Sequence, residues 1–406
     1  MKNLCKIPLF LYFIVGCFIF GWWFVALRSP TLSSIAIETP QNLSLKTSAL
    51  LNELSLFQRE ALMNALAGDF SLMSELIEQW DKDALVLLQQ KKKNIQRLST
   101  DDYLLTRILA HLIKSSSSET LRHLNSKMNK LTLNNFKKFL PQTYVSASFL
   151  LAIAPPAEIL ALPSGMRRLH QIYKTSFLDQ IPHDFHSHRK DQLDIAQIDL
   201  AFVAPYSHPP TLQLLKRKGI PLCSIKHSTQ LEDIHKALLK VGHASNHILE
   251  AQLLSLFMQS AFLNIDNRLQ ALSQNFPKEE NETSRLLYVS YHYGYSQPAS
   301  KSISFQMLTR ALNHCPRFQN CLAAEPKEGS IPLSQEQVAQ KDPGIIIISG
   351  PFTSIQKFIA TPELQQTLAY QSKNIFFLDE DIQDSPTQYA ALAYYDLYQI
   401  LSSTFL

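Results

Sequence analysis

The pattern of apolar residues changes its period along the chain. From Lys46 to about Leu140, apolar residues recur three and four positions apart, which gives each of several helices one buried stripe. Strand patterns are almost absent there, so residues 46–140 are predicted to form an all-helical segment. After Pro141, short apolar runs alternate with helical patterns. That alternation is typical of parallel strands connected by helices.

Residues 141–245 are predicted to form an N-terminal α/β lobe. Its expected strands are short apolar runs that end near proline or glycine: FLLAIA (149–154), DLAFVA (199–204) and IPLCSI (220–225). Its expected helices are AEILAL (157–162), TLQLLKRKG (211–219) and LEDIHKALLKVG (231–242).

A long helix and a second lobe are predicted next. The helical pattern continues without a break over 246–273, which corresponds to roughly 40 Å at 1.5 Å per residue. We assign residues 246–275 to a bridging helix and residues 284–406 to a C-terminal α/β lobe. The lobe's expected strands are LLYVS (286–290), GIIIIS (344–349) and NIFFLDED (374–381), and its expected helices are 303–313, 362–371 and 386–403. The predicted fold class is therefore α/β, with two Rossmann-like lobes joined by one long helix.

The first 28 residues predict a membrane anchor or a signal peptide. Two lysines precede 20 uncharged residues, 8–27, and a helix of that length can cross the hydrocarbon core of a bilayer. The tetrapeptide IVGC, which ends at Cys17, is similar to a bacterial lipobox, so Cys17 is a candidate for lipidation. An uncleaved anchor, a lipoprotein and a cleaved signal remain as alternatives. After a linker, 29–45, the rest of the chain is expected at the periplasmic face of the bacterial inner membrane.

Composition excludes some function classes. A net charge of +4 on 406 residues is too small to favour nucleic-acid binding. The sequence contains no GxSxG, P-loop or HExxH motif, so an enzyme is not expected. Among the five cysteines, Cys315 and Cys321 have a spacing that could close a small disulfide loop in an oxidising compartment, and no Cys/His spacing favours a zinc site.

Four segments carry a resemblance to a known family. They are APPAEILAL (154–162), IDLAFVAP (198–205), the stretch 216–242 that begins KRKGIPL, and SQEQVAQKDPGIIII (334–348). In this order and spacing the chain resembles the class III periplasmic substrate-binding proteins, the receptors of ABC importers for iron–siderophore complexes, haem and cobalamin. The resemblance covers about residues 141–406.

The resemblance implies two lobes with a ligand held in the cleft between them. It also implies permease and ATPase subunits of an ABC transporter as partners, a monomeric protein, and no cofactor of its own. Open α/β sheets bind ligands beyond the carboxyl ends of their strands, which identifies the cleft loops. They are Pro155–Pro156, Tyr173–His188, Pro205–Pro209, Lys226–Ser228, Ser290–Gln297, Gly350–Ser354 and Asp379–Asp384.

Two aromatic segments are the leading candidates for ligand contact. The C-lobe stretch YHYGY and the N-lobe stretch PYSH would form opposite walls of the cleft. Their candidate residues are Tyr291, His292, Tyr293 and Tyr295, and Tyr206, Ser207 and His208. Phenolate and imidazole groups suit ferric iron and haem, so the candidate metal ligands are Tyr206, His208, Tyr291 and His292. The alternative is that these side chains only cover the lobe edges.

Four further residues complete the expected cleft. Pro155 and Pro156 would line it after the first strand. Lys226 and His227 are the cationic candidates that could meet carboxylates or propionates of a ligand.

One departure from the family leaves a second hypothesis open. Family members commonly present a glutamate on each lobe that pairs with permease arginines, and the corresponding positions here are Pro209 and Lys301. The first hypothesis is a tethered binding protein that delivers haem, a ferric siderophore or cobalamin to a permease. The alternative is a membrane-anchored envelope interaction or structural protein that keeps this fold without transport.

Overall fold

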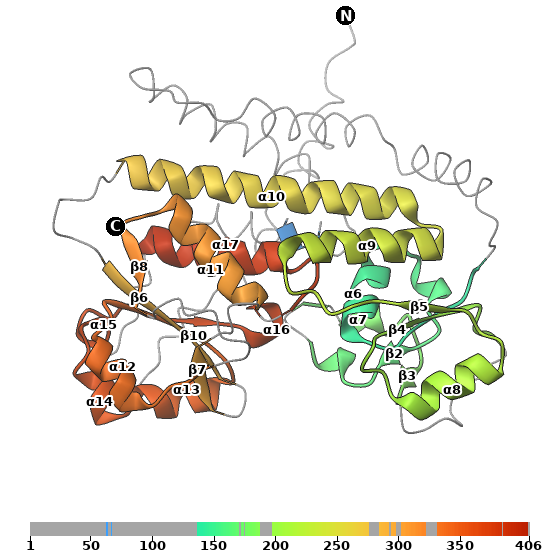
Figure 1. Ribbon diagram of the computed structural model, residues 1–406, viewed down its shortest axis with the longest axis horizontal. Coiled ribbons are helices and arrows are strands. Elements are labelled where there is room, and N and C mark those ends of the chain that lie inside the picture. The colour runs from blue at the N-terminus through green and yellow to red at the C-terminus, as the bar shows by residue number, and fades with distance from the viewer. Residues whose placement is uncertain are drawn as a thin grey trace, which may run out of the picture.

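The computed structural model describes residues 62, 63, 66, 136–169, 172–173, 175–186, 197–275, 284–291, 294–297, 302–321, 331–383 and 385–404. Two lobes lie under the two halves of one long helix, α10 (Ile248–Asn275), as Figure 1 shows. Each lobe contains parallel strands and helices, so the predicted α/β fold is confirmed. The expected anchor, linker and most of the all-helical segment lie outside the described residues.

The N-terminal lobe contains a small parallel sheet in the order β1-β4-β5. Its strands are β1 (Phe139–Pro141), β4 (Leu200–Val203) and β5 (Leu222–Ser224). The strands expected at 199–204 and 220–225 are confirmed. Side chains of β4 alternate between two cores, because Leu200 and Phe202 face one side of the sheet and Ala201 and Val203 face the other.

The strand expected at 149–154 is wrong, because this stretch belongs to helix α6 (Tyr144–Ile153). Thr143 caps the helix: its Oγ1 accepts a hydrogen bond from the backbone N–H of Ser146, and the Ser146 hydroxyl accepts one from the backbone N–H of Thr143. The helix is buried on nearly all sides from Ser146 to Leu151. It therefore lacks the polar stripe that would distinguish a helix from a buried strand in the sequence.

The helix expected at 157–162 is also wrong. This stretch contains only the short 3₁₀ turn η1 (Pro156–Glu158) and the first residue of strand β2 (Leu162–Pro163). β2 pairs in parallel with β3 (Asp184–Phe185), and the chain between them forms η2 (Met166–Arg168) and α7 (Thr175–Leu178).

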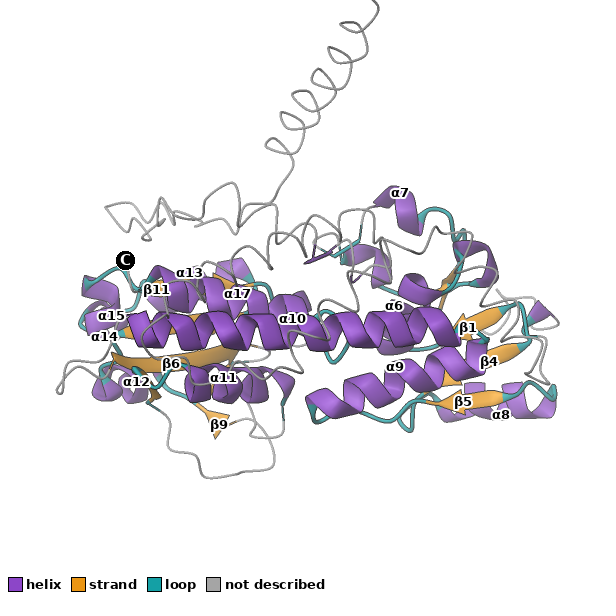
Figure 2. Cartoon of the chain, turned by 90° about the horizontal axis from the view of Figure 1, so that it is seen from above, coloured by secondary structure: helices purple, strands orange, loops and turns teal. Residues whose placement is uncertain are grey.

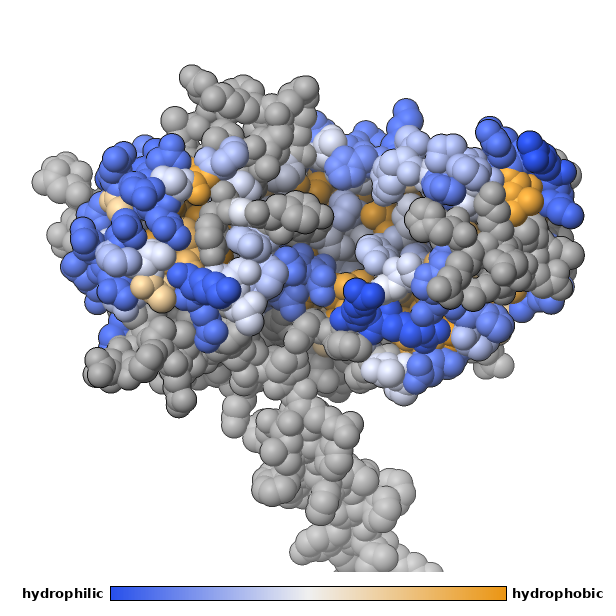
Figure 3. Space-filling model, turned by 90° about the horizontal axis from the view of Figure 1, so that it is seen from below, coloured by the Kyte–Doolittle hydropathy of each residue, from blue (hydrophilic) through white to orange (hydrophobic). Residues whose placement is uncertain are grey.

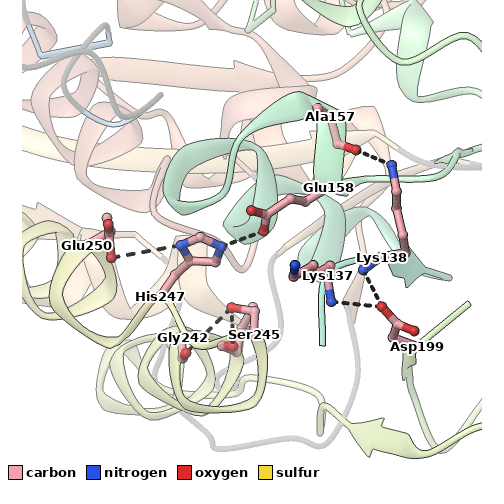
Figure 4. A network of polar contacts seen from close by, with 10 residues as sticks. Lys137, Lys138, Ala157, Glu158, Asp199, Gly242, Ser245, His247 and Glu250 are labelled. Atoms are coloured by element: carbon pink, nitrogen blue, oxygen red, sulfur yellow. Dashed lines mark hydrogen bonds and ion pairs between the residues drawn. The ribbon is translucent and has the colours of Figure 1, made fainter. Parts of the chain in front are cut away.

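Helix α9 (Leu231–Ser245) and the long helix α10 form a helical hairpin that connects the lobe to the rest of the molecule. α8 (Pro209–Arg217) and α9 appear as predicted, and α9 packs along α10. Gly242 allows the close approach, since a Cβ there would lie 2.3 Å from the Cβ of Ala251. At the turn, His247 Nε2 lies 2.8 Å from Glu158 Oε2 and Nδ1 lies 4.0 Å from Glu250 Oε2 (Figure 4). This contact ties the turn to η1.

The C-terminal lobe is built on a six-stranded mixed sheet with the path β11-β10-β6-β7-β9 and with β8 paired to β6. The strands are β6 (Ser284–Tyr291), β7 (Tyr295–Gln297), β8 (Phe318–Asn320), β9 (Ile331–Pro332), β10 (Ile345–Ser349) and β11 (Ile375–Leu378). The three expected strands are present, but the third ends at Leu378, because Glu380 and Asp381 belong to helix α16 (Glu380–Gln383), which also replaces most of the cleft loop expected at 379–384. The short strands β7, β8 and β9 have no counterpart among the predictions, since two or three residues carry no periodic signal.

Helices cover both faces of this sheet. They are α11 (Ile303–His314), α12 (Gln335–Lys341), α13 (Phe352–Ile359), α14 (Pro362–Gln365), α15 (Leu368–Gln371), α16 (Glu380–Gln383) and α17 (Ala390–Ser403). The helix expected at 362–371 is broken into α14 and α15, because Thr367 caps a new helix start by accepting from the N–H of Tyr370. The cleft loop expected at 350–354 is shorter, because α13 begins at Phe352.

One hydrophobic core extends through both lobes. It includes alternate residues of β4 in the first lobe and of β6 and β10 in the second, joined by the inward faces of α6, α10 and α17. Figure 2 shows α10 crossing both lobes, with α9 beside it over one and α11 and α17 beside it over the other. Two smaller cores fill the opposite faces of the sheets. Because the lobes share buried side chains, α10 is part of a packed unit and does not act as a free linker.

A short piece of the expected all-helical segment also belongs to this core. Residues 62, 63 and 66 are helical, and Leu62 and Leu66 are 1 % and 0 % exposed within the shared cluster. Of the helices in the described ranges, none is both long and apolar enough to cross a membrane.

Candidate functional site

A cavity of about 500 Å³ lies between the two lobes. Ligand pockets for small molecules typically have volumes of about 300–1,000 Å³, so this cavity is of a suitable size. Both lobes contribute to its wall. The N-lobe residues are Gln142, Thr143, Tyr144, Val145, Ser148, Pro163, Ser164, Leu169, Ile172, Phe185, Tyr206 and His227, and the C-lobe residues are Glu380, Asp381, Ser385, Pro386 and Thr387.

The first turn of α6 forms much of the N-lobe wall. Tyr144 begins the helix, is 47 % exposed, and donates a hydrogen bond from its hydroxyl to the Ser164 carbonyl at 2.9 Å. Gly165 makes this position possible: it has a φ of +93°, and a Cβ there would lie 2.5 Å from the Tyr144 hydroxyl oxygen. The Tyr144 ring is therefore held at the cavity wall with part of its surface in solvent.

Two residues that follow N-lobe strands also line the cavity. Tyr206 comes three residues after β4 and is 66 % exposed, and His227 is an exposed residue after β5. Partial burial raises the pKa of Tyr206 above its ordinary value of 10.0. The phenol is therefore neutral at pH 7, and a metal could bind its oxygen only by displacing the proton.

The C-lobe wall consists of α16 and the loop that follows it. Asp379 precedes the helix, and its Oδ1 accepts a hydrogen bond from the backbone N–H of Asp381 at 2.9 Å. Burial, with the neighbouring charge of Asp379 as the smaller cause, raises the pKa of Asp381 above its ordinary value of 3.8. Glu380 and Asp381 thus face a wall whose polar groups are hydroxyls, one amide and the imidazole of His227.

Of the candidate cleft residues, Tyr206 and His227 line this cavity. The other described N-lobe candidates do not. Ser207 is buried, and its Oγ accepts from the backbone N–H of Ala204 at 2.9 Å, which shapes the turn that presents Tyr206. His208 precedes α8, with Nδ1 3.3 Å from Thr211 Oγ1. Lys226 is exposed, and Pro155 and Pro156 form the turn at η1.

Of the YHYGY stretch, the structure describes Tyr291, Gly294 and Tyr295. Tyr295 at the start of β7 pairs antiparallel with Tyr291, which ends β6. Gly350 packs against it: its φ is +152°, and a Cβ there would lie 2.8 Å from the Cβ of Tyr291. Tyr291 is not part of the cavity wall, and His292 and Tyr293 lie outside the described residues. Across from Tyr206, the cavity wall is α16 and the loop 385–387.

The described residues contain no group of three or more His, Cys, Asp or Glu side chains that could hold a metal ion. Among the described residues, no such cluster therefore stands beside the tyrosine and histidine side chains that the sequence analysis proposed as metal ligands.

The disulfide suggested by the cysteine spacing is not formed, because Cys315 and Cys321 are both free thiols. Cys315 ends α11 and is fully buried, whereas Cys321 follows the three-residue strand β8. Cys17, the lipidation candidate, lies outside the described residues.

Tyr144 is one of several cavity residues on and around the start of α6 that the sequence analysis missed. The reason is the wrong strand at 149–154, which hid the helix start at Thr143. The signal was present as TYVS, in which a threonine and a serine three residues apart can form a capping box.

The face of the molecule shown in Figure 3 carries mostly hydrophilic side chains over both lobes. Apolar residues appear there as small separate areas. An extended apolar patch would favour a docking surface for another protein. On this face the described side chains do not favour such a surface.

Comparison with known families supports the same kind of fold. The model of a family described as periplasmic binding protein matches residues 215–382, from within α8 to α16. The resemblance expected from the sequence is therefore confirmed. No curated protein matches the chain.

Solved structures of periplasmic binding proteins superimpose on about two thirds of the chain. A possible iron-binding solute-binding protein from Staphylococcus epidermidis has 16 % identity and a TM-score of 0.52, covering 66 % of this chain and 99 % of that one. The heme-binding protein HutB of Vibrio cholerae has 17 % identity and a TM-score of 0.50, with coverage of 66 % and 99 %. The molybdate-binding protein MolA of Haemophilus influenzae has 14 % identity and a TM-score of 0.51, covering 67 % of this chain and 88 % of that one. At these identities the likeness concerns the fold.

Proposed function

We propose that this chain, whose residues 215–382 match the periplasmic binding protein family, captures a small solute between its lobes and delivers it to an ABC importer. The observation that carries the proposal is the cavity of about 500 Å³ lined from both lobes. A ligand in contact with both walls is held by two rigid units, so a small closing motion is enough to retain or release it. No covalent chemistry is involved.

The ligand class that we favour is a metal chelate, namely haem, a ferric siderophore or cobalamin. Tyr144 and Tyr206 offer partly exposed aromatic rings that can stack on a flat macrocycle or an aromatic chelator. His227 adds an imidazole on the same wall. The structural neighbours named for iron, heme and molybdate support a metal-containing ligand as a class.

Tyr206 is the residue that we expect to contact the metal or the ring. Its phenol has a raised pKa, so binding as a phenolate would release a proton and would strengthen as the pH rises. Binding by stacking alone would not depend on that proton. Replacing Tyr206 by phenylalanine separates the two modes because it keeps the ring and removes the oxygen.

Titration of the purified full-length protein with hemin, followed at the Soret band, tests the proposal. We expect a saturable shift with one hemin per chain, a loss of binding of about tenfold or more in Tyr206→Ala, and retention of binding in Tyr370→Ala. Tyr370 is a half-buried tyrosine on α15, away from the cavity, and serves as the control. Absence of binding by wild type to hemin, to a ferric siderophore and to cobalamin would refute the chelate class.

The expected partners are the permease and ATPase subunits of an ABC importer, and the expected location is the periplasmic face of the inner membrane. A monomer would present both lobes to the permease at once. Tethering would come from the N-terminal segment, as an anchor helix or through a lipid on Cys17. Protease protection of the lobes in intact cells, and their digestion after the outer membrane is opened, is the expected result.

One observation favours the second candidate, an envelope interaction protein without transport. Pro209 is exposed at the first turn of α8, where the family resemblance leads us to expect a glutamate for permease docking. Affinity capture of the cross-linked full-length protein distinguishes the candidates. Recovery of permease and ATPase subunits supports transport, and recovery of envelope proteins without them supports the second candidate.

A further inference from the structure

Three parts of the chain meet at one buried side chain behind the cavity. Gln388 is fully buried, and its Nε2 donates to the Ser148 carbonyl of α6 at 2.8 Å and to the Leu66 carbonyl at 3.2 Å. These partners lie 240 and 322 residues away along the chain. The single amide group therefore joins the C-terminal lobe, the N-terminal lobe and the expected all-helical segment.

The bond to α6 lies directly at the cavity. Ser148 is a cavity-lining residue of the N-lobe wall, and Thr387, the residue before Gln388, is a lining residue of the C-lobe wall. A change in this bond therefore changes the spacing of the two walls. The rings of Tyr173 and Tyr389 meet edge to face at 5.7 Å, which adds an aromatic contact between the same two lobes.

The bond to Leu66 reaches a helical segment that is buried in the core shared by both lobes. Leu62 and Leu66 are four residues apart, so on a helix they share one face, and both are buried in the core formed by α6, α10 and α17. In Figure 1 this segment lies between the lobes, next to α10 and α17. Apolar anchoring and a backbone hydrogen bond together hold it against both lobes.

We propose that the helical residues 62, 63 and 66 form an internal brace that fixes the spacing of the cavity walls, with Gln388 as its positioning residue. Loss of either hydrogen bond of Gln388 would loosen the spacing of the two walls and so change how tightly the cavity retains its ligand. The proposal rests on the proposed function only in treating this cavity as the ligand site.

The two buried glutamines of this part of the chain give a matched test. Gln388→Leu keeps the volume and removes both donor bonds. Gln383 is 2 % exposed, and its Nε2 donates to Ala393 at 3.3 Å within the C-terminal lobe, so Gln383→Leu is the control. Leu66→Ala removes apolar burial of the brace and leaves both glutamines in place. It is the alternative variant if Gln388→Leu does not fold.

Hydrogen–deuterium exchange of the full-length protein measures the effect without a ligand. Loss of two neutral hydrogen bonds is expected to speed exchange about tenfold or more in Gln388→Leu. The affected peptides should be those covering α6, residues 385–389 and residues 62–66. Leu66→Ala should give the same pattern in α6 and 385–389, and Gln383→Leu should leave α6 unchanged. Unchanged α6 exchange in both Gln388→Leu and Leu66→Ala would overturn the brace.

A hemin titration then tests regulation. If wild type binds hemin, Gln388→Leu and Leu66→Ala should change its dissociation constant by about tenfold, and Gln383→Leu should not. Equal affinity in all four proteins would refute the positioning role. If wild type does not bind hemin, hemin is excluded as the ligand, and the exchange pattern still decides whether the brace exists.

Discussion

The buried carboxylate of Asp266 allows a quantitative prediction about how much the contact of three helices contributes to the free energy of unfolding. Asp266 lies on α10, is 5 % exposed, and accepts from Arg310 on α11 through Nε at 3.0 Å and Nη2 at 2.6 Å. The hydroxyl of Tyr394 on α17 donates to the same carboxylate at 2.6 Å. Burial lowers the pKa of Arg310, but hydrogen bonding and the charge of Asp266 outweigh it, so the pKa is raised. Three helices therefore meet at one charge.

Asp266→Asn removes that charge and keeps the shape of the side chain. Removing one partner of a buried pair costs roughly 3–5 kcal/mol, since the other charge remains without compensation. The Arg310 side chain is 31 % exposed and stacks over Phe262 at 5.3 Å, so some compensation persists. We therefore expect a loss of about 3 kcal/mol in the free energy of unfolding.

Guanidinium unfolding of the full-length protein, followed by circular dichroism, measures the loss. The exposed pair between Arg167 and Asp179 at 3.4 Å is the control, because Asp179 is 61 % exposed and Asp179→Asn should cost less than about 0.5 kcal/mol. A cost of Asp266→Asn within about 1 kcal/mol of wild type would refute the view that this charge holds the three helices together.

Three further predictions concern the cavity wall, the cysteines and a glycine. Because burial raises the pKa of Asp381, the native state binds its proton more tightly and stability falls as the pH rises above 3.8; Asp381→Asn should raise the melting temperature at pH 7, with the gain vanishing near pH 4. Burial raises the pKa of Cys315 to about 11, so iodoacetamide should not label the folded protein at Cys315 or Cys321. After unfolding, both cysteines should be labelled even when no reductant is present, and a disulfide-linked peptide would contradict this. Gly350→Ala should destabilise by about 2 kcal/mol or more through its positive φ and the Tyr291 contact, and an unchanged melting temperature would exclude that contact.

The elements that were predictable from the sequence are those with long, one-sided patterns. GIIIIS became β10, and the unbroken pattern over 246–273 became α10, because length and β-branched residues separate strand from helix. FLLAIA failed because α6 is buried on nearly every side, so its six apolar residues carry no helical period. The strand that precedes it, FLP at 139–141, has three residues and ends in proline, which is too little for a periodic signal.

The candidate site was predictable in part for a related reason. The loops after β4 and β5 follow strands that the sequence places correctly, and they supply Tyr206 and His227 to the cavity, whereas Asp381 comes from helix α16. The position of α16 across from Tyr206 was not predictable, because which elements face each other depends on how two lobes pack along α10. Gln388 could not be found either, since its partners lie 240 and 322 residues away.

The central claim is that the cavity between the lobes holds a small ligand. Native mass spectrometry of the full-length protein, purified gently from its own cell envelope, tests this claim without choosing a ligand in advance. We predict one small molecule per chain, a metal chelate by its isotope pattern, bound to wild type and to Tyr370→Ala and lost from Tyr206→Ala. A protein that carries no small molecule, or that retains it equally in Tyr206→Ala, would contradict the account.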